Sequence, residues 1–227
     1  METGKLFVAA TPIGNLKDIT LRALEILKEA DFILCEDTRI TGRILSHYKI
    51  KNELISFNAR TEEKKIEHVV NRISQGDSGV LVTDSGTPCI SDPGTRLVNA
   101  LHKNNIIVAG IPGPNAAITA LSISGLPTDS FIFEGFLPQK KGRQKKLSAL
   151  SEEARTIVLY ESPYRIEKML NELNQYMPER MLFIGRELTK MFEEYWSGYP
   201  ADILNTLDEK KIKGEFVIII SPLNWKD

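Results

Sequence analysis

Short, almost wholly apolar runs alternate with segments of helical periodicity along this chain, and that alternation limits the possible folds most strongly. Runs such as Phe32–Cys35 and Val80–Thr83 carry no charged residue. Between them, the apolar side chains of residues 66–73 follow the i, i+3, i+4, i+7 spacing of a helix with one buried face. Apolar strands separated by helices predict an α/β fold with a parallel sheet that is covered on both faces.

The expected strands fall into two groups, separated by a glycine- and proline-rich region over residues 110–129. We expect strands at residues 6–10, 32–35, 54–57, 80–83, 106–109, 131–133, 156–160, 181–184, 192–196 and 216–220. We expect helices at residues 19–30, 66–73 and 115–124, and one that starts with Ser162 as N-cap and Pro163 at the first helical position. This grouping predicts an N-terminal α/β lobe with a parallel sheet over residues 1–116 and a C-terminal α/β lobe with a mixed sheet over residues 117–227.

Composition excludes several classes of protein. The 227 residues carry a formal net charge of −1, so any nucleic-acid binding must come from a local patch. The two cysteines form neither a disulfide framework nor a zinc motif, and the three histidines lack metal-ligand spacing, so no metal is expected. With no apolar run of 18 residues and no signal-peptide pattern, the sequence predicts a cytoplasmic protein without membrane contact. Neither a G-x-G-x-x-G motif after the first strand nor a P-loop is present.

Three expected strands end in loops rich in glycine and proline, at residues 10–15, 83–94 and 110–117. Ligands of open α/β sheets bind at the carboxyl ends of strands, where glycine allows close approach to the backbone. Three such loops favour a binding pocket over ordinary turn chemistry. We expect a β-branched side chain at Gly86 or Gly113 to intrude on the ligand.

Charged residues follow several of the other expected strands. The segment Glu36–Arg39 suits either a substrate or the cap of a following helix, because Asp37 and Thr38 are both good N-caps. Glu161, and Glu187 with Lys190, also follow expected strands. For these, a site in contact with substrate and buried ion pairs are both open interpretations.

The strongest local charge feature is a basic segment of five residues, Lys140, Lys141, Arg143, Lys145 and Lys146. A run of this kind is usually a solvated face, but in a chain of nearly zero net charge it also suits RNA phosphates. If it contacts RNA, replacing all five residues with serine should weaken RNA binding and leave the fold intact.

Taken together, the loop motifs resemble a known family. They occur in the order Thr11–Leu16, Glu36–Arg39, Asp84–Pro88, Ser91–Gly94, Pro112–Pro114, Gly135–Pro138, Tyr160–Ser162 and Arg186–Lys190. From about residue 5 to 221 the chain closely resembles the family of ribosomal RNA small subunit methyltransferase I, a branch of the tetrapyrrole methylase superfamily.

The resemblance implies two α/β lobes with S-adenosyl-L-methionine in the cleft between them, and a homodimer. It implies 2'-O-methylation of a cytidine in the decoding region of 16S ribosomal RNA within the small ribosomal subunit. The implied cofactor contacts are Pro12, Gly86, Thr87, Pro88, Ile90, Asn115, Ala116 and Gly214.

Deprotonation of a ribose hydroxyl benefits from a nearby base or cation. The candidate catalytic residues are therefore Glu161 and Glu187 as proton acceptors, with Arg39 and Lys190 stabilising charge. Relatives often carry a histidine- and acid-rich stretch where this chain has Phe57–Thr61, so no histidine role is carried over. Two other functions stay open: a methylase acting on a tetrapyrrole carbon, and a non-catalytic ribosome-assembly factor.

Overall fold

The alternation of strands and helices is realised as two units, each with its own five-stranded sheet. The structure is a computed structural model and describes residues 4–207 and 213–226. The units are Met1–Asn115 and Ala116–Asp227, a division that lies one residue from the expected boundary. None of the helices in the described ranges combines the length and the apolar character needed to span a bilayer.

The first sheet is parallel throughout, as predicted, with strand order β3-β2-β4-β1-β5. Its strands are β1 (Lys5–Ala9), β2 (Phe32–Cys35), β3 (Leu54–Ser56), β4 (Gly79–Leu81) and β5 (Ile107–Ile111). The connecting helices are α1 (Leu21–Glu29), α2 (Thr38–His47), α3 (Glu62–Ser74) and α4 (Thr95–Lys103), with a short 3-10 helix, η1 (Leu16–Asp18).

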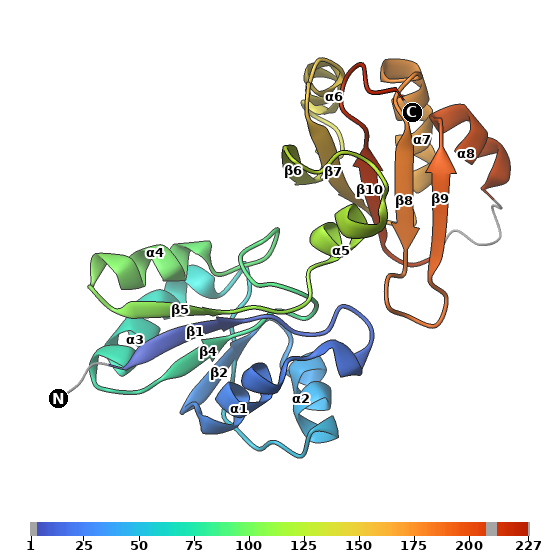
Figure 1. Cartoon of the computed structure of the whole chain (residues 1–227). Helices are drawn as coiled ribbons and strands as arrows, with labels where there is room; N and C mark the ends of the chain where they lie inside the picture. Colours follow the sequence, from blue (N-terminus) through green and yellow to red (C-terminus); the bar gives the residue numbers. More distant parts are fainter. Residues whose placement is uncertain (1–3, 208–212, 227) are drawn as a thin grey trace. The chain divides into compact units, whose positions relative to one another are not determined.

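Side chains of this sheet alternate between two buried layers. Phe32 and Leu34 of β2 pack into a cluster with residues of α3 and α4, whereas Ile33 and Cys35 pack with residues of α1 and α2. Figure 1 shows these two pairs of helices on opposite faces of the sheet. Burial on both faces explains why the strands are almost wholly apolar in sequence.

The second sheet is mixed, with strand order β6-β7-β10-β8-β9. Its strands are β6 (Phe131–Phe136), β7 (Thr156–Glu161), β8 (Leu182–Arg186), β9 (Glu194–Gly198) and β10 (Phe216–Ile220). Only β6 and β7 pair in parallel. The helices of this unit are α5 (Ala116–Ile123), α6 (Arg143–Ser151), α7 (Ile166–Tyr176) and α8 (Pro200–Thr206).

The expected start of the helix after β7 is wrong. The α-helix begins at Ile166, and Ser162 and Pro163 belong to a turn that precedes it. The backbone N–H of Ser162 donates to the Glu161 carboxylate at 2.8 Å, and the carbonyl of Ser162 accepts from the N–H of Arg165 at 3.0 Å. These local hydrogen bonds close a turn, and the helix begins three residues later than predicted.

Candidate functional site

The three glycine- and proline-rich loops of the first unit are held together at one edge of the sheet. Thr11 and Gly86 exchange two backbone hydrogen bonds, at 2.9 and 3.1 Å. The Thr11 hydroxyl also donates to the carbonyl of Thr83 at 3.0 Å, and the Thr87 hydroxyl donates to the carbonyl of Pro114 at 3.0 Å. The loops that follow β1, β4 and β5 are therefore joined to one another, because those strands are neighbours in the sheet.

Most of the predicted cofactor contacts lie in these joined loops. Pro12, Gly86 and Pro88 are buried, Thr87 is half-buried, and the Ile90 side chain is exposed. Asn115 is the last residue of the first unit, and Ala116 is the first residue of α5.

Two glycines in these loops are needed by the chain's own packing. Gly86 has φ +84°, and a Cβ there would lie 3.3 Å from Cγ2 of Ile13. A Cβ on Gly113 would lie 2.9 Å from Cβ of Ala10. A side chain at Gly113 would therefore first meet Ala10, the residue that follows β1, and its intrusion on a ligand stays a prediction.

An acidic cluster lies beside these loops, where β2 and β4 end next to each other. The Thr83 hydroxyl donates to the carboxylate of Glu36 at 3.5 Å, and the backbone N–H of Asp37 donates to Asp84 at 3.0 Å. Burial raises the pKa of Asp92 to about 6; a hydrogen bond from Thr83 opposes this rise, and the negative charges of Glu36 and Asp84 add to it. Burial also raises the pKa of Glu36, and the negative charge of Asp84 adds to this rise.

Sequence reasoning missed Asp92 as a site residue. It lies in a predicted loop, but its proximity to Glu36, 56 positions earlier in the chain, depends on β2 and β4 being neighbours, which the sequence does not reveal. A carboxyl group with a strongly perturbed pKa at the carboxyl end of a parallel sheet is a candidate functional group.

The segment after β2 has the capping role that the sequence left open. Asp37 is the N-cap of α2, and its side chain accepts a hydrogen bond from the backbone N–H of Arg39 at 2.8 Å. Arg39 also donates through Nε to Asp37 at 3.0 Å, while its side chain remains 82% exposed. The hydrogen bonds from Arg39 lower the pKa of Asp37 to about 2. Arg39 is thus accessible to a ligand, whereas Asp37 is committed to the helix.

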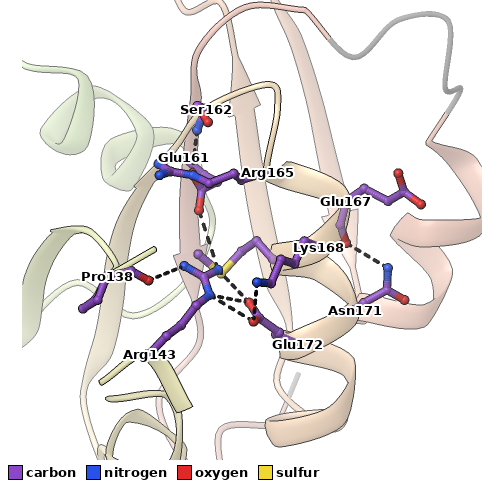
Figure 2. A network of polar contacts seen from close by, with 10 residues as sticks. Pro138, Arg143, Glu161, Ser162, Arg165, Glu167, Lys168, Asn171 and Glu172 are labelled. Carbon is purple, nitrogen blue, oxygen red and sulfur yellow. Dashed lines mark hydrogen bonds and ion pairs between the residues drawn. The ribbon is translucent and has the colours of Figure 1, made fainter. Parts of the chain in front are cut away.

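In the second unit, Glu161 belongs to the polar network shown in Figure 2. Its side chain is fully buried; Oε1 accepts from Nε of Arg165 at 2.7 Å, and Oε2 lies 3.8 Å from Nη2 of Arg143. No hydrogen bond reaches Oε2 among the described residues. This environment favours the buried ion pair over direct contact with substrate, and it orients Arg165, whose guanidinium carbon lies 6.0 Å from the ring centroid of Phe136.

The basic segment does not face solvent as a whole. Arg143 is 3% exposed and donates to the Glu172 carboxylate through Nη2 at 2.6 Å and Nε at 2.8 Å. Lys146 pairs with Glu134 at 2.7 Å. The expectation that all five residues can be replaced without effect on the fold is therefore wrong. Lys140, Lys141 and Lys145 are exposed, and no carboxylate of the described chain lies within ion-pair distance of them.

Glu187 and Lys190 form the ion pair that their spacing suggests, with Nζ 2.9 Å from Oε1. Lys190 also pairs with Glu215 at 3.0 Å, and the Glu215 backbone N–H donates to Glu187 at 2.9 Å. Burial favours a higher pKa for Glu187, but Lys190 and the Glu215 N–H outweigh burial and lower it. For Lys190, burial is likewise outweighed by Glu187 and Glu215, which raise its pKa. Both groups are therefore ionised near neutral pH.

Gly214, the last predicted cofactor contact, lies beside this pair. Its φ is +95°, and a Cβ there would lie 2.3 Å from Cγ of Glu187. The absence of a side chain at Gly214 thus leaves the space that Glu187 occupies. Across residues 4–207 and 213–226, no three His, Cys, Asp or Glu side chains are arranged to hold a metal ion.

Comparison with known proteins gives three results. The family model of the Tetrapyrrole (Corrin/Porphyrin) Methylases matches residues 5–203. Ribosomal RNA small subunit methyltransferase I of Thermotoga maritima is 43% identical over 218 residues, which make up 96% of this chain and 98% of the relative. The protein of the same name from Escherichia coli O157:H7 is also 43% identical, over 96% of this chain and 77% of the relative.

Solved structures share the fold at lower identity. Uroporphyrin-III-C-methyltransferase from Thermus thermophilus superposes with a TM-score of 0.68 at 21% identity, covering 96% of this chain and 94% of that one. A structure of uroporphyrin-III C-methyl transferase from the same organism, complexed with S-adenyl homocysteine, superposes with a TM-score of 0.66 at 18% identity, covering 95% of this chain and 97% of that one. These likenesses confirm the predicted α/β fold.

Proposed function

The chain belongs to the tetrapyrrole methylase family and, within it, to the group of ribosomal RNA small subunit methyltransferase I, and from this premise we propose that it methylates 16S ribosomal RNA. The methyl donor is S-adenosyl-L-methionine. The target we propose is the 2'-oxygen of a cytidine in the decoding region of the small ribosomal subunit. The observation that carries the proposal is 43% identity to a protein of that name over nearly the whole of both chains.

The residues of the first unit fit this methyl donor. Its sulfonium and ammonium groups are cations, and its adenine and ribose offer hydrogen-bond donors. The joined loops present buried backbone around Pro12 and Gly86, and the neighbouring cluster supplies the carboxylates of Glu36, Asp84 and Asp92. We propose that Pro12, Gly86–Pro88, Ile90, Asn115 and Ala116 hold the donor. When bound, S-adenosyl-L-methionine supplies an electrophilic methyl group on a positively charged sulfur.

The chain's own contribution to methyl transfer is to position the ribose and to accept its proton. In the Glu187–Lys190 pair, the ammonium is a donor that stabilises charge developing on the ribose oxygen. The Glu187 carboxylate is ionised and accepts a proton, although its lowered pKa makes it a weak base. Arg39 is exposed and suits contact with a phosphate. Glu161 acts through Arg165 as a positioning residue.

Experiments can distinguish the proposed function from two others, a tetrapyrrole methylase and a non-catalytic assembly factor. A methylase acting on a tetrapyrrole carbon is the activity named for several structural neighbours, but at 21% identity or below that likeness reports the fold alone. A non-catalytic assembly factor would bind small subunits without consuming the methyl donor.

The decisive experiment supplies labelled S-adenosyl-L-methionine and small ribosomal subunits from a strain that lacks the protein. We expect label on one cytidine ribose of 16S RNA, located by nuclease mapping and mass spectrometry of the nucleosides. Label on a nucleobase would contradict the 2'-O assignment, and the absence of any label on RNA would contradict the RNA substrate. A parallel reaction with uroporphyrinogen tests the tetrapyrrole alternative.

Two further parts of the proposal rest on family membership. We propose a homodimer, for which light scattering at micromolar concentration should return about twice the chain mass of 25.5 kDa. We also propose that the protein acts in the cytoplasm, where small subunits are assembled; fractionation of cells that carry a tagged chain tests this.

A further inference from the structure

The basic segment and α7 together form a hollow of about 420 Å³ on the second unit. Its lining side chains include Lys140, Arg143, Lys145, Lys168 and a single carboxylate, Glu172. Arg143 belongs to α6 and Glu172 to α7, so the hollow lies where these two helices meet.

The charges of the hollow fall into two groups. The paired side chains of Arg143 and Glu172 form a neutral floor, and the ammonium groups of Lys140, Lys145 and Lys168 form a cationic rim. Arg143 and Glu172 bind each other through two short contacts, so the carboxylate is already compensated. Lys168 lies 3.9 Å from Glu172, at the limit of an ion pair, and its side chain is 60% exposed. Lys140 and Lys145 are exposed and lack a carboxylate partner among the described residues. The rim therefore has three ammonium groups with little local compensation.

Arg143 of the floor also holds the loop that carries Lys140 of the rim. Nη1 of Arg143 donates to the carbonyl of Pro138 at 3.0 Å, which attaches the loop carrying Lys140 to the start of α6 (Figure 2). A concave arrangement of cations is suited to an anion with several oxygens, such as a phosphate group.

Exposed aromatic rings lie at the end of β6 and in the turn after β7, the strands that precede α6 and α7. The strands β6 and β7 are parallel neighbours, with Phe136 opposite Tyr160, so the segments that follow them leave the same edge of the sheet. Phe136 is 53% exposed and Tyr164 is 94% exposed. Exposed rings beside cations are the features with which proteins bind single-stranded RNA, because the rings stack on bases while the cations contact phosphates.

We propose that this hollow, with Lys140, Lys145 and Lys168 at its rim, binds a backbone phosphate of single-stranded RNA. This inference rests on the proposed function for the identity of the nucleic acid, and it adds a contact that the basic segment alone did not indicate, Lys168 of α7. It also restricts the segment's role: Lys140 and Lys145 contact RNA, whereas Arg143 and Lys146 maintain the structure.

The test compares two triple variants of the full-length protein. The first carries Lys140→Ser, Lys145→Ser and Lys168→Ser. The matched control carries Lys28→Ser, Lys51→Ser and Lys103→Ser, which remove the same charge from exposed lysines that have no ion pair in the described chain. These control positions precede β2, β3 and β5, at the amino edge of the first sheet and away from its binding loops.

Binding of a fluorescent single-stranded RNA of the decoding region is measured by anisotropy over a range of salt concentrations. We expect the rim variant to lose about tenfold or more in affinity at low salt, with a salt slope smaller by about 0.7, because the hollow binds one phosphate and each lost phosphate contact removes about 0.7 from the slope. The control variant should bind within about twofold of the wild type. Affinity for S-adenosyl-L-methionine and the melting temperature should stay unchanged in both.

Equal RNA binding by the rim and control variants overturns the proposal, whether or not the wild type methylates RNA. Calorimetric binding of inorganic phosphate that depends on the rim lysines, without any change in RNA affinity, also overturns it in favour of a small-anion site. Failure of the proposed function is seen separately, as absence of label on 16S RNA with the wild type. The binding comparison still decides the role of the rim in that case.

Discussion

The buried guanidinium of Arg143 donates three hydrogen bonds to the carboxylate of Glu172, which lies 29 residues further along the chain. Arg143 is therefore the buried member of a segment in which Lys146 pairs with Glu134 and the other three lysines are exposed. Its position decides which basic residues are available to a ligand and which hold α6 against α7.

Replacement of Arg143 by alanine should destabilise the second unit by about 3 kcal/mol, because it leaves the buried carboxylate of Glu161 and the half-buried carboxylate of Glu172 with fewer partners. Urea titration followed by circular dichroism measures the loss. Lys145→Ala in the same helix is the control and should change stability by less than about 0.5 kcal/mol. Similar stabilities for the two variants would show that the buried pair contributes little.

Gly214→Ala should disturb the Glu187–Lys190 pair, because the new Cβ overlaps the Glu187 side chain. Gly125→Ala is a matched control: Gly125 has φ +70°, and a Cβ there meets no atom within 4 Å. Both variants lose about 1–2 kcal/mol from left-handed backbone strain. We expect Gly214→Ala to lose at least about 1 kcal/mol more and to reduce methyl transfer more than tenfold. Full activity in Gly214→Ala would remove Glu187 and Lys190 from the mechanism.

Thr87→Val removes the hydroxyl that donates to the carbonyl of Pro114 and leaves a side chain of nearly the same shape. Loss of one such hydrogen bond is worth about 1 kcal/mol, so affinity for S-adenosyl-L-methionine should fall about fivefold if the joined loops hold the donor. Thr206→Val, which loses a comparable bond to the carbonyl of Ile203 in α8, should not change affinity. Calorimetry that finds equal affinities would indicate that this loop contact is unimportant for binding.

The raised pKa of Asp92, about 6, predicts a pH dependence of stability. Between the ordinary carboxyl pKa near 4 and this value, the folded protein binds more protons than the unfolded chain, so stability falls as pH rises through that window. Asp92→Asn should therefore stabilise the protein at pH 7 by at most about 3 kcal/mol, with the gain disappearing below about pH 4. Melting curves at pH 4 and 7 test this; a pH-independent difference would contradict it.

The sheets were predictable because their central strands are buried on both faces. The expected strands at 32–35 and 216–220 coincide with β2 and β10, in which every residue is buried. Helix α6 was not predicted, because only Leu147, Leu150 and the charged Arg143 are buried on it. A basic run gives no periodic apolar signal, so its helical state depends on tertiary contacts with α7.

The sequence predicts the parts of the site that lie within a single loop, but not those that depend on contacts between different strands or helices. The glycines and prolines of residues 83–94 indicate a ligand loop by themselves, whereas the environment of Asp92 depends on Glu36 from a different strand. Likewise, charge pattern did not distinguish Arg143 from Lys145, because the partner Glu172 lies on another helix.

The strand order of the first sheet also has a consequence for folding during synthesis. β1 pairs with β4 and β5. Its hydrogen bonds in the sheet can therefore form only after Gly79, the partner of Leu6, and Ile107, the partner of Lys5, have been synthesised. Closure over such long sequence separations slows folding, and a nascent chain exposes an unpaired apolar strand until both partners have emerged. The loop bridge between Thr11 and Gly86 can form only after that event, so a chain truncated before β4 should have no cofactor site and should be prone to aggregation.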